Sequence, residues 1–268
     1  MAYDLVSIVR RLKTRRRSVA ARAVVPTRAR TDALAAVYLD VVRAWRDQIT
    51  GRVLPAYGAL HDRLMRDDAQ DQMSEALAAA AAAVSALAIQ YRPRLIQWVA
   101  EFDAWHMQRF AQTIRAAVVV DPLPMMSPIE TAPARQVAVE RMAALLGSVD
   151  DQTRGRVAQA VWSGVAQRQP LAQVSAGLRD VIAASRRRAT GIAEDKTDTI
   201  SSEMDEARQA EAGLDWFRWR HSRNRRPRHW HQARDGKLFR RGQIPPDDMA
   251  GVPPHCDCKA EPWIGLDD

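Results

Sequence analysis

Two short groups of histidine and cysteine residues have the side-chain types that bind a transition metal. His229 and His231 are two residues apart, as are Cys256 and Cys258. Imidazole and thiolate groups that converge from two loops can hold a zinc ion in tetrahedral geometry. We therefore predict these four residues as candidate metal ligands, and we expect no cofactor other than a zinc ion at this position.

A different interpretation of the cysteines stays open. Structural zinc loops usually place two to four residues between their cysteines, and only Asp257 separates Cys256 from Cys258. A disulfide between them is disfavoured because its ring would be very small, and because two cysteines in the whole chain suit a reducing compartment. The alternative to a metal site is therefore a pair of small buried thiols.

Motifs for enzyme chemistry are weak in this sequence. It has no glycine-rich phosphate loop, no nucleophile elbow and no His-Glu-x-x-His pair. Asp235-Gly236 is typical of a turn rather than of a catalytic acid. We predict that the protein is not an enzyme. The alternative is a metal-dependent nuclease built on His231, Cys256 and Cys258, with His231 as general base.

Basic residues are concentrated in two segments. The chain has 268 residues and a net charge of +8, and residues 1–30 alone hold nine basic residues against one acid. Residues 216–241 hold ten basic residues against one acid, interleaved with three tryptophans. Because residues 31–268 carry no net charge in total, the other residues of that range must balance this +9. Arginine beside tryptophan suits phosphate contact and base stacking. The alternatives are an acidic protein partner or arginine stacked on tryptophan for packing. The candidate nucleic-acid-binding residues are Arg10, Arg11, Lys13, Arg15, Arg16, Arg17, Arg22, Arg226 and Arg228.

The remaining pattern predicts a mainly α protein, with long N-terminal helices followed by a small α+β C-terminal module. Four parts are expected: a basic arm over 1–30, a long-helix region over 31–120, a proline-rich linker over 121–133 and a C-terminal domain over 134–268. Helical periodicity predicts helices over 135–146, 150–166, 170–184 and 190–212, the last ended by Gly213. The alternation of large apolar and basic residues after Asp215 predicts a strand.

Signals for export or membrane insertion are not recognised in the sequence. The N-terminal residues lack the apolar segment of a signal peptide. The most apolar run, Ala76 to Ile89, has 14 residues and consists mostly of alanine, which is short for a bilayer span. We expect a soluble intracellular protein without a membrane partner.

A helix pattern, a strand-and-loop pattern, a turn and a cysteine pair follow one another over roughly residues 150–268. The residues that carry them are Ile192, Ala193, Asp195, Thr197, Arg208, Gln209, Gly213, Trp219, Arg220, Ser222, Arg226, Arg228, His231, Asp235, Gly236, Cys256 and Cys258. In this order they resemble the Mu F-like family of tailed-phage minor head (head morphogenesis) proteins. The sequence departs from the pattern at Asn224, His229 and Asp257.

This resemblance implies a structural minor head protein without established enzymatic activity. It implies association with the portal vertex and with packaged double-stranded DNA, in head morphogenesis, genome packaging or retention, or ejection. The implied partners are the portal protein and other head proteins, with several copies in the virion and assembly in the host cytoplasm. A third class, a soluble DNA-binding regulator, is less favoured because the helices lack a helix-turn-helix signature.

Overall fold

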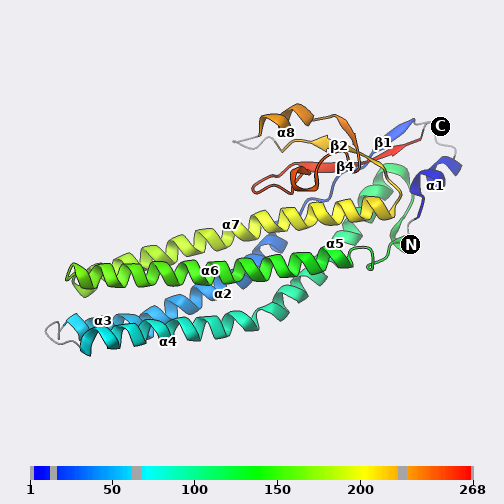
Figure 1. Cartoon of the computed structure of the whole chain (residues 1–268). Helices are drawn as coiled ribbons and strands as arrows, with labels where there is room; N and C mark the ends of the chain where they lie inside the picture. The colour runs from blue at the N-terminus through cyan, green and yellow to red at the C-terminus, as the bar shows by residue number, and fades with distance from the viewer. Residues whose placement is uncertain (1–2, 13–16, 62–67, 223–227, 267–268) are drawn as a thin grey trace. The chain divides into compact units, whose positions relative to one another are not determined.

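The computed structural model describes residues 3–12, 17–61, 68–222 and 228–266, and its elements are shown in Figure 1. The α-helices are α1 (Leu5–Arg11), α2 (Arg28–Gln48), α3 (Leu54–His61), α4 (Asp68–Gln90), α5 (Arg92–Val118), α6 (Ala132–Ala166), α7 (Leu171–Glu211) and α8 (His229–Arg234). The strands are β1 (Ser18–Ala20), β2 (Trp216–Arg220), β3 (Leu238–Arg240) and β4 (Lys259–Gly265). A π-helical turn (Ile49–Val53) joins α2 to α3, and 3₁₀ turns lie at Leu123–Met125 and Pro246–Asp248.

The predicted fold class is confirmed. The protein is 72% helical and has a small four-stranded antiparallel sheet near its C-terminus. The sheet order is β1-β4-β2-β3, so the last strand of the chain lies between the first and the second. In β4, Trp263 is opposite Ala20 of β1 on one side and Trp216 of β2 on the other.

The number of C-terminal helices differs from the prediction. The predicted helices over 135–146 and 150–166 form one helix, α6, and those over 170–184 and 190–212 form one helix, α7. Residues at both expected breaks are helical, and their side chains form hydrogen bonds between α6 and α7. Ser148 accepts a hydrogen bond from Arg188, and the buried Ser185 accepts one from Thr153. Tertiary contacts therefore override the local composition at both predicted breaks.

The end of α7 and the start of the sheet follow the sequence pattern. Gly213 has a φ of 65°, and the Leu214 amide donates to the carbonyl of Gln209 in the bond that closes a helix at a left-handed glycine. In β2, Phe217 and Trp219 are buried, whereas Trp216 lies on the opposite, exposed face. The predicted strand is thus confirmed, with its apolar face turned to the core.

The chain divides into two compact units. The first comprises residues 1–31, 98–138 and 195–268, and the second comprises residues 32–97 and 139–194. Four of the described helices, α2, α5, α6 and α7, contribute residues to both units. Each unit therefore combines segments that are far apart in the sequence.

The second unit is organised around a buried carboxylate. Asp150 in α6 accepts hydrogen bonds from the Trp45 indole of α2 at 2.7 Å and from the Ser85 hydroxyl of α4 at 2.8 Å. The Tyr38 hydroxyl of α2 donates to the carbonyl of Met142, also in α6. These bonds satisfy polar groups within an apolar helix core and fix α2 and α4 against α6.

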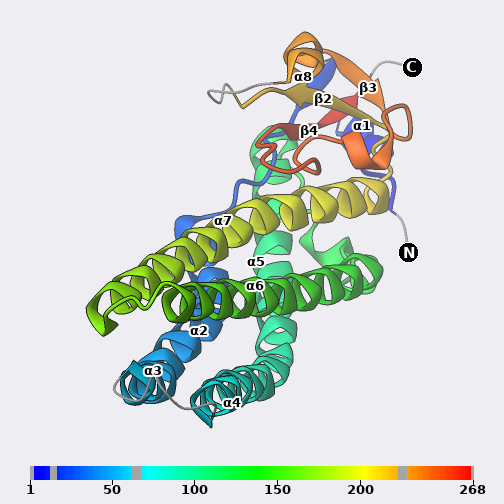
Figure 2. The same ribbon diagram turned by 60° about the vertical axis from the view of Figure 1, so that its left-hand side comes forward.

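In the first unit, the N-terminal segment packs against the sheet and the end of α7. The apolar side chains of Leu5 and Val9 in α1 are buried with Ala212 and Leu214. The first strand, β1, pairs with β4, and the Ala21 amide donates to the carbonyl of Pro262. Figure 2 shows β1, β4 and β2 beside the C-terminal half of α7. The expected basic arm therefore includes a helix and a strand.

One helical stretch has the length and composition of a membrane span. Gln70–Val118 contains an 18-residue window with a mean hydropathy of 1.4, of which 17% is buried. Core helices of soluble proteins pass the same test, so it is weak evidence for a span. The apolar run Ala76 to Ile89 lies within this longer helical stretch. The short length of the run therefore does not by itself exclude a span.

Replacing Asp150 with alanine should destabilise the second unit. The Trp45 N–H and the Ser85 hydroxyl would lose their acceptor, which costs about 1–3 kcal/mol for buried polar groups. The neighbouring Asp151 is exposed and pairs with Arg154 on the surface, so Asp151→Ala should cost less than about 0.5 kcal/mol. Urea unfolding of the two variants measures the difference. Equal losses would contradict the proposed organisation.

Candidate functional site

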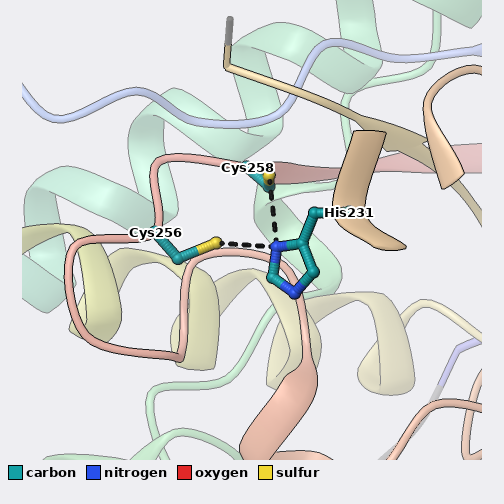
Figure 3. A group of neighbouring side chains, drawn as sticks. All are labelled: His231, Cys256 and Cys258. Atoms are coloured by element: carbon teal, nitrogen blue, oxygen red, sulfur yellow. Dashed lines mark hydrogen bonds between the residues drawn. The ribbon is translucent and has the colours of Figure 1, made fainter. Parts of the chain in front are cut away.

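His231, Cys256 and Cys258 converge in the first unit, as Figure 3 shows. His231 lies on the short helix α8, and the two cysteines lie on the loop that leads into β4. One donor atom from each side chain lies within 4.8 Å of the others, and all three residues are buried. The sequence prediction placed these three residues together, and the structure brings them together.

The Nδ1 atom of His231 faces both sulfurs. It lies 3.4 Å from the Cys256 Sγ and 3.6 Å from the Cys258 Sγ. The other ring nitrogen, Nε2, is 3.0 Å from the Asp248 carboxylate. Because a carboxylate accepts hydrogen bonds, Asp248 favours the tautomer that carries its proton on Nε2. The lone pair of Nδ1 then points at the thiols.

Asp248 is itself held by neighbours of His231. The Trp230 indole donates to it at 3.2 Å, and the Arg234 guanidinium pairs with it at 2.7 Å. Burial works against the charged form, but the hydrogen bonds from His231, Arg234 and Trp230 prevail and lower the pKa of Asp248. The carboxylate is thus ionised and positioned to orient the imidazole.

The surroundings of the sulfurs favour a thiolate. A hydrogen bond from the Cys258 thiol lowers the pKa of Cys256 to about 5, against the effect of burial, and the amides of Cys258 and Gly251 contribute in the same direction. Since Cys258 is the donor in that bond, its own pKa is raised. The Ser222 amide and the buried Trp219 indole N–H both favour the thiolate of Cys258.

His229 does not join this group. It is exposed at the start of α8, and it is not among the residues that converge on the sulfurs. Two residues along a helix correspond to a rotation of about 200°, so His229 and His231 point to different sides. The sequence prediction of His229 as a ligand is therefore not supported by its position.

Helix α7 anchors the cysteine loop through two carboxylates, of which Asp195 belongs to the family pattern. The Asp195 carboxylate accepts a hydrogen bond from the His255 amide at 2.5 Å, and Asp198 pairs with Lys259 at 2.8 Å. Arg228 also donates a hydrogen bond to the carbonyl of Pro254, next to His255. The cysteines are therefore held at both ends of their loop.

Gly251 allows the loop to approach α7 closely. Its φ is 80°, and a Cβ atom added there would lie 2.0 Å from the Ser202 Oγ and 3.0 Å from the Cys258 carbonyl oxygen. Only glycine adopts this conformation at so close an approach without strain.

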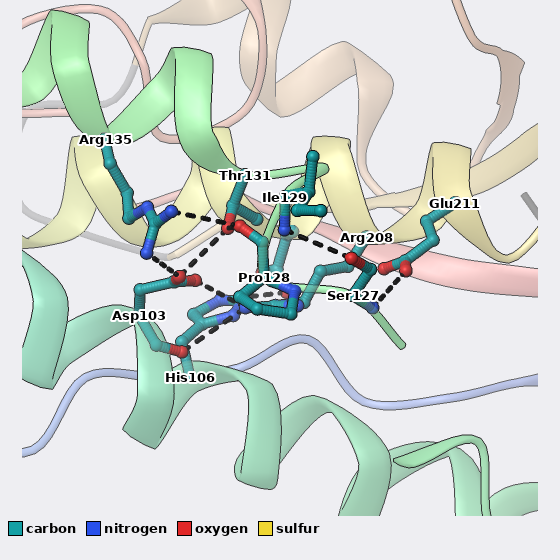
Figure 4. Close-up of polar contacts among 10 residues, drawn as sticks. Asp103, His106, Ser127, Pro128, Ile129, Thr131, Arg135, Arg208 and Glu211 are labelled. Atoms are coloured by element: carbon teal, nitrogen blue, oxygen red, sulfur yellow. Dashed lines mark hydrogen bonds and ion pairs between the residues drawn. The ribbon is translucent and has the colours of Figure 1, made fainter. Parts of the chain in front are cut away.

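A buried polar network lies under the C-terminal end of α7 (Figure 4). Arg208 is fully buried and pairs with Asp103 of α5 at 2.5 Å. Asp103 also accepts from the Thr131 hydroxyl at 2.9 Å and lies 3.3 Å from Arg135. Burial lowers the pKa of Arg208, and the charge of Asp103 opposes this effect.

The same network fixes the segment over 121–133, which was predicted as a linker. The Ser127 amide donates to Glu211 of α7, and burial raises the pKa of Glu211. The next residue of the family pattern, Gln209, donates to the carbonyl of Ala260 in β4. Arg208 and Gln209 therefore perform structural tasks, which single-sequence reasoning did not assign to them.

The arginines of the Trp216–Arg241 segment have acidic partners from elsewhere in the chain. Arg218 and Arg220 approach Glu261 of β4, and Arg241 pairs with Glu206 of α7. Arg234 stacks over the buried Trp219 ring at 4.9 Å. Packing and internal pairing therefore account for much of this segment. Arg226 lies outside the described residues.

The N-terminal arginines are placed differently. Arg10 and Arg11 are exposed at the end of α1, and Arg17 and Arg22 are exposed on either side of β1. We call these four residues the N-terminal basic surface. Lys13, Arg15 and Arg16, which were also predicted to contact nucleic acid, lie outside the described residues. The surface borders a groove of about 630 Å³ whose lining includes Arg22 and Arg109.

Replacing Gly251 with alanine should loosen the cysteine loop. The left-handed backbone and the clash with Ser202 together should cost roughly 2–4 kcal/mol. Gly155 in α6 has no atom within 4 Å of an added Cβ, so Gly155→Ala should stabilise by about 0.5–1 kcal/mol. Thermal unfolding of both variants tests this contrast, and a neutral Gly251→Ala would refute it.

Removing the buried guanidinium should destabilise the first unit strongly. Arg208→Met leaves Arg135 as a remaining cationic partner of the buried Asp103 carboxylate. Removing one member of a buried ion pair costs about 3–5 kcal/mol. The double variant Arg208→Met/Asp103→Leu should recover part of this loss because the buried Asp103 carboxylate is also removed. Denaturant unfolding measures both variants, and Arg109→Met serves as the exposed control. A double variant less stable than Arg208→Met would contradict the interpretation.

Residues 152–261, which contain these α7, strand, loop and cysteine positions, match the family described as Phage Mu protein F like protein. A Haemophilus influenzae (strain Rd) protein, described only as an uncharacterized protein, is 27% identical over 121 residues, which is 45% of this chain and 27% of that protein. The chain thus spans less than a third of the length of this relative. No solved structure matches. Residues 152–261 therefore form a Phage Mu protein F-like domain.

Proposed function

We propose that this protein is a structural minor head protein of a tailed phage that is associated with the portal vertex and contacts packaged DNA. It acts there in head morphogenesis, genome packaging or retention, or ejection. The observation that carries the DNA contact is the N-terminal basic surface, defined by Arg10, Arg11, Arg17 and Arg22. Arg17 and Arg22 are exposed on either side of β1, which pairs with β4, a strand that begins inside the Mu F-like domain.

Several features support a DNA contact at this surface. The four arginines are exposed, and α1 and β1 hold the backbone around them. Arginine side chains on a fixed backbone can meet successive phosphates of a duplex without ordering a flexible segment. The groove beside Arg22 adds the exposed Arg109, whose guanidinium donates to the Gln112 side chain. The surface thus has the charge for a sequence-independent interaction with the phosphate backbone.

The helices of the second unit are the part proposed to contact the portal protein. Leu87, Ile89 and Ile96 are exposed apolar residues near the junction of α4 and α5. The alanine-rich α4 and the middle of α6 line a shallow groove that includes Ala78, Ala81 and Trp162. Small side chains allow a helix of another subunit to approach closely, so this face suits helix-to-helix docking.

The nuclease alternative receives less support. His231 and both cysteines are buried, and the carboxylate beside His231 engages its ring rather than the sulfurs. Nucleases that use two metal ions clamp both oxygens of a phosphate displacement, which requires an accessible site. Proteins of the Mu F-like family are generally structural phage proteins. The arrangement therefore favours a non-enzymatic role.

Neutralising the N-terminal basic surface should weaken DNA binding and its dependence on salt. The variant replaces Arg10, Arg11, Arg17 and Arg22 with alanine in the full chain. If all four contact phosphates, the slope of log K against log salt should fall by roughly 3–4 units. Fluorescence anisotropy with a labelled duplex of random sequence, measured from low to moderate salt, gives the slope.

A control of equal charge separates this surface from net charge alone. Alanine at the exposed residues Arg46, Arg154, Arg179 and Arg187 of the second unit also removes four charges. This control should retain most of the slope. Equal effects of the two variants would refute a specific surface.

Mass spectrometry of purified virions before and after DNA ejection tests head membership, and absence from virions would refute the proposed function.

A further inference from the structure

We propose that His231, Cys256 and Cys258 bind one zinc ion through Nδ1 and two sulfurs, and that this ion links α8 to the loop before β4. The ion has a structural task, and it is independent of the proposed contact with DNA. Three donor atoms of suitable chemistry converge here from positions 25 and 27 residues apart. Such convergence requires the fold to place them, so it is not a consequence of sequence proximity.

The distances fit a tetrahedral ion. With bonds of about 2.3 Å to sulfur and about 2.0–2.1 Å to nitrogen, the tetrahedral angle separates nitrogen and sulfur by about 3.6 Å. The Nδ1 atom of His231 lies 3.4 Å from one sulfur and 3.6 Å from the other. An ion can therefore enter between the three atoms with little movement of the side chains.

Neighbouring groups orient the imidazole of His231 and stabilise the thiolates for zinc binding. Asp248 accepts from the Nε2 side of His231, which is the carboxylate–histidine arrangement found around zinc ligands. The amides of Gly251 and Ser222 are directed at the two sulfurs, where they stabilise the negative charge of thiolates. Trp219 packs edge-on against the His231 ring at 4.9 Å and limits its rotation.

Zinc is favoured over other groups that cysteines bind. Iron–sulfur clusters generally take four cysteine ligands, and the chain has two. Two thiolates and an imidazole are a common ligand set for zinc. Among the described residues, no fourth histidine, cysteine or carboxylate joins the group. We assign the fourth position to a water molecule.

The proposed ion closes a loop that contains α8, β3 and the turn at Pro246–Asp248. Cross-linking distant residues lowers the entropy of the unfolded chain, and metal binding also contributes folding free energy directly. Asp248 and Arg234 belong to the same closed segment, and Trp230 directly precedes it. The ion is thus placed to stabilise the segment between α8 and β4.

The first test is the metal content of the full chain purified without chelator and dialysed against zinc-free buffer. We expect about one zinc per chain by elemental analysis. His231→Ala, Cys256→Ser and Cys258→Ser should each lose most of it. His229→Ala and His255→Ala remove histidines that lie outside the group and should retain it. Loss of zinc in His229→Ala equal to that in His231→Ala would overturn the assignment.

Two further measurements test the ligand geometry, and the first uses wild-type protein alone, so it does not depend on whether a variant folds. Wild-type protein reconstituted with cobalt(II) should show the intense visible bands of a tetrahedral site and a thiolate-to-cobalt charge-transfer band. Asp248→Asn should weaken zinc binding about 10–100-fold in competition with a chromophoric chelator, because the imidazole loses its orienting partner. Folded wild-type protein with neither zinc nor a thiolate–cobalt band would overturn the proposal. DNA binding is not part of either readout.

Discussion

The first unit depends on the position of β4. This strand pairs with β1 on one side and with β2 on the other, and it is attached to α7 through Gln209 and Lys259. The loop before β4 carries the two cysteines. Arg17 and Arg22 lie on either side of its partner strand β1. A displacement of β4 would therefore affect both the thiol group and the N-terminal basic surface.

The family pattern is explained by the task of holding β4 and its loop. Asp195 binds the loop amide, Gln209 binds the strand, and Gly213 turns the chain from α7 towards β2. Arg208 fixes the same end of α7 to α5 through Asp103. Each of these residues contacts another part of the chain. Their chemistry is that of attachment and chain reversal, so these residues stabilise the fold of the domain.

The sequence was sufficient to predict the fold class, the strand at Trp216–Arg220 and the helix end at Gly213, because each follows from a local pattern. It also grouped His231 with the cysteines. It did not separate His229 from His231, because the short helix α8 was not recognised, and only helical rotation turns the two rings apart. It overstated the basic segment, because Glu206 and Glu261 are distant in sequence and close in space. The continuous course of α6 and α7 also depended on contacts such as that of Ser185 with Thr153.

The pairing of β1 with β4 has a consequence for the order in which the molecule forms. Ser18 is opposite Gly265, so this part of the sheet joins residues nearly the whole chain apart. Contacts of such long sequence separation form late, because the intervening loop must first close. During synthesis β1 therefore lacks its partner until β4 leaves the ribosome. The arginines beside β1 acquire their fixed arrangement only when the chain has been made through β4, so an incomplete product lacks this surface.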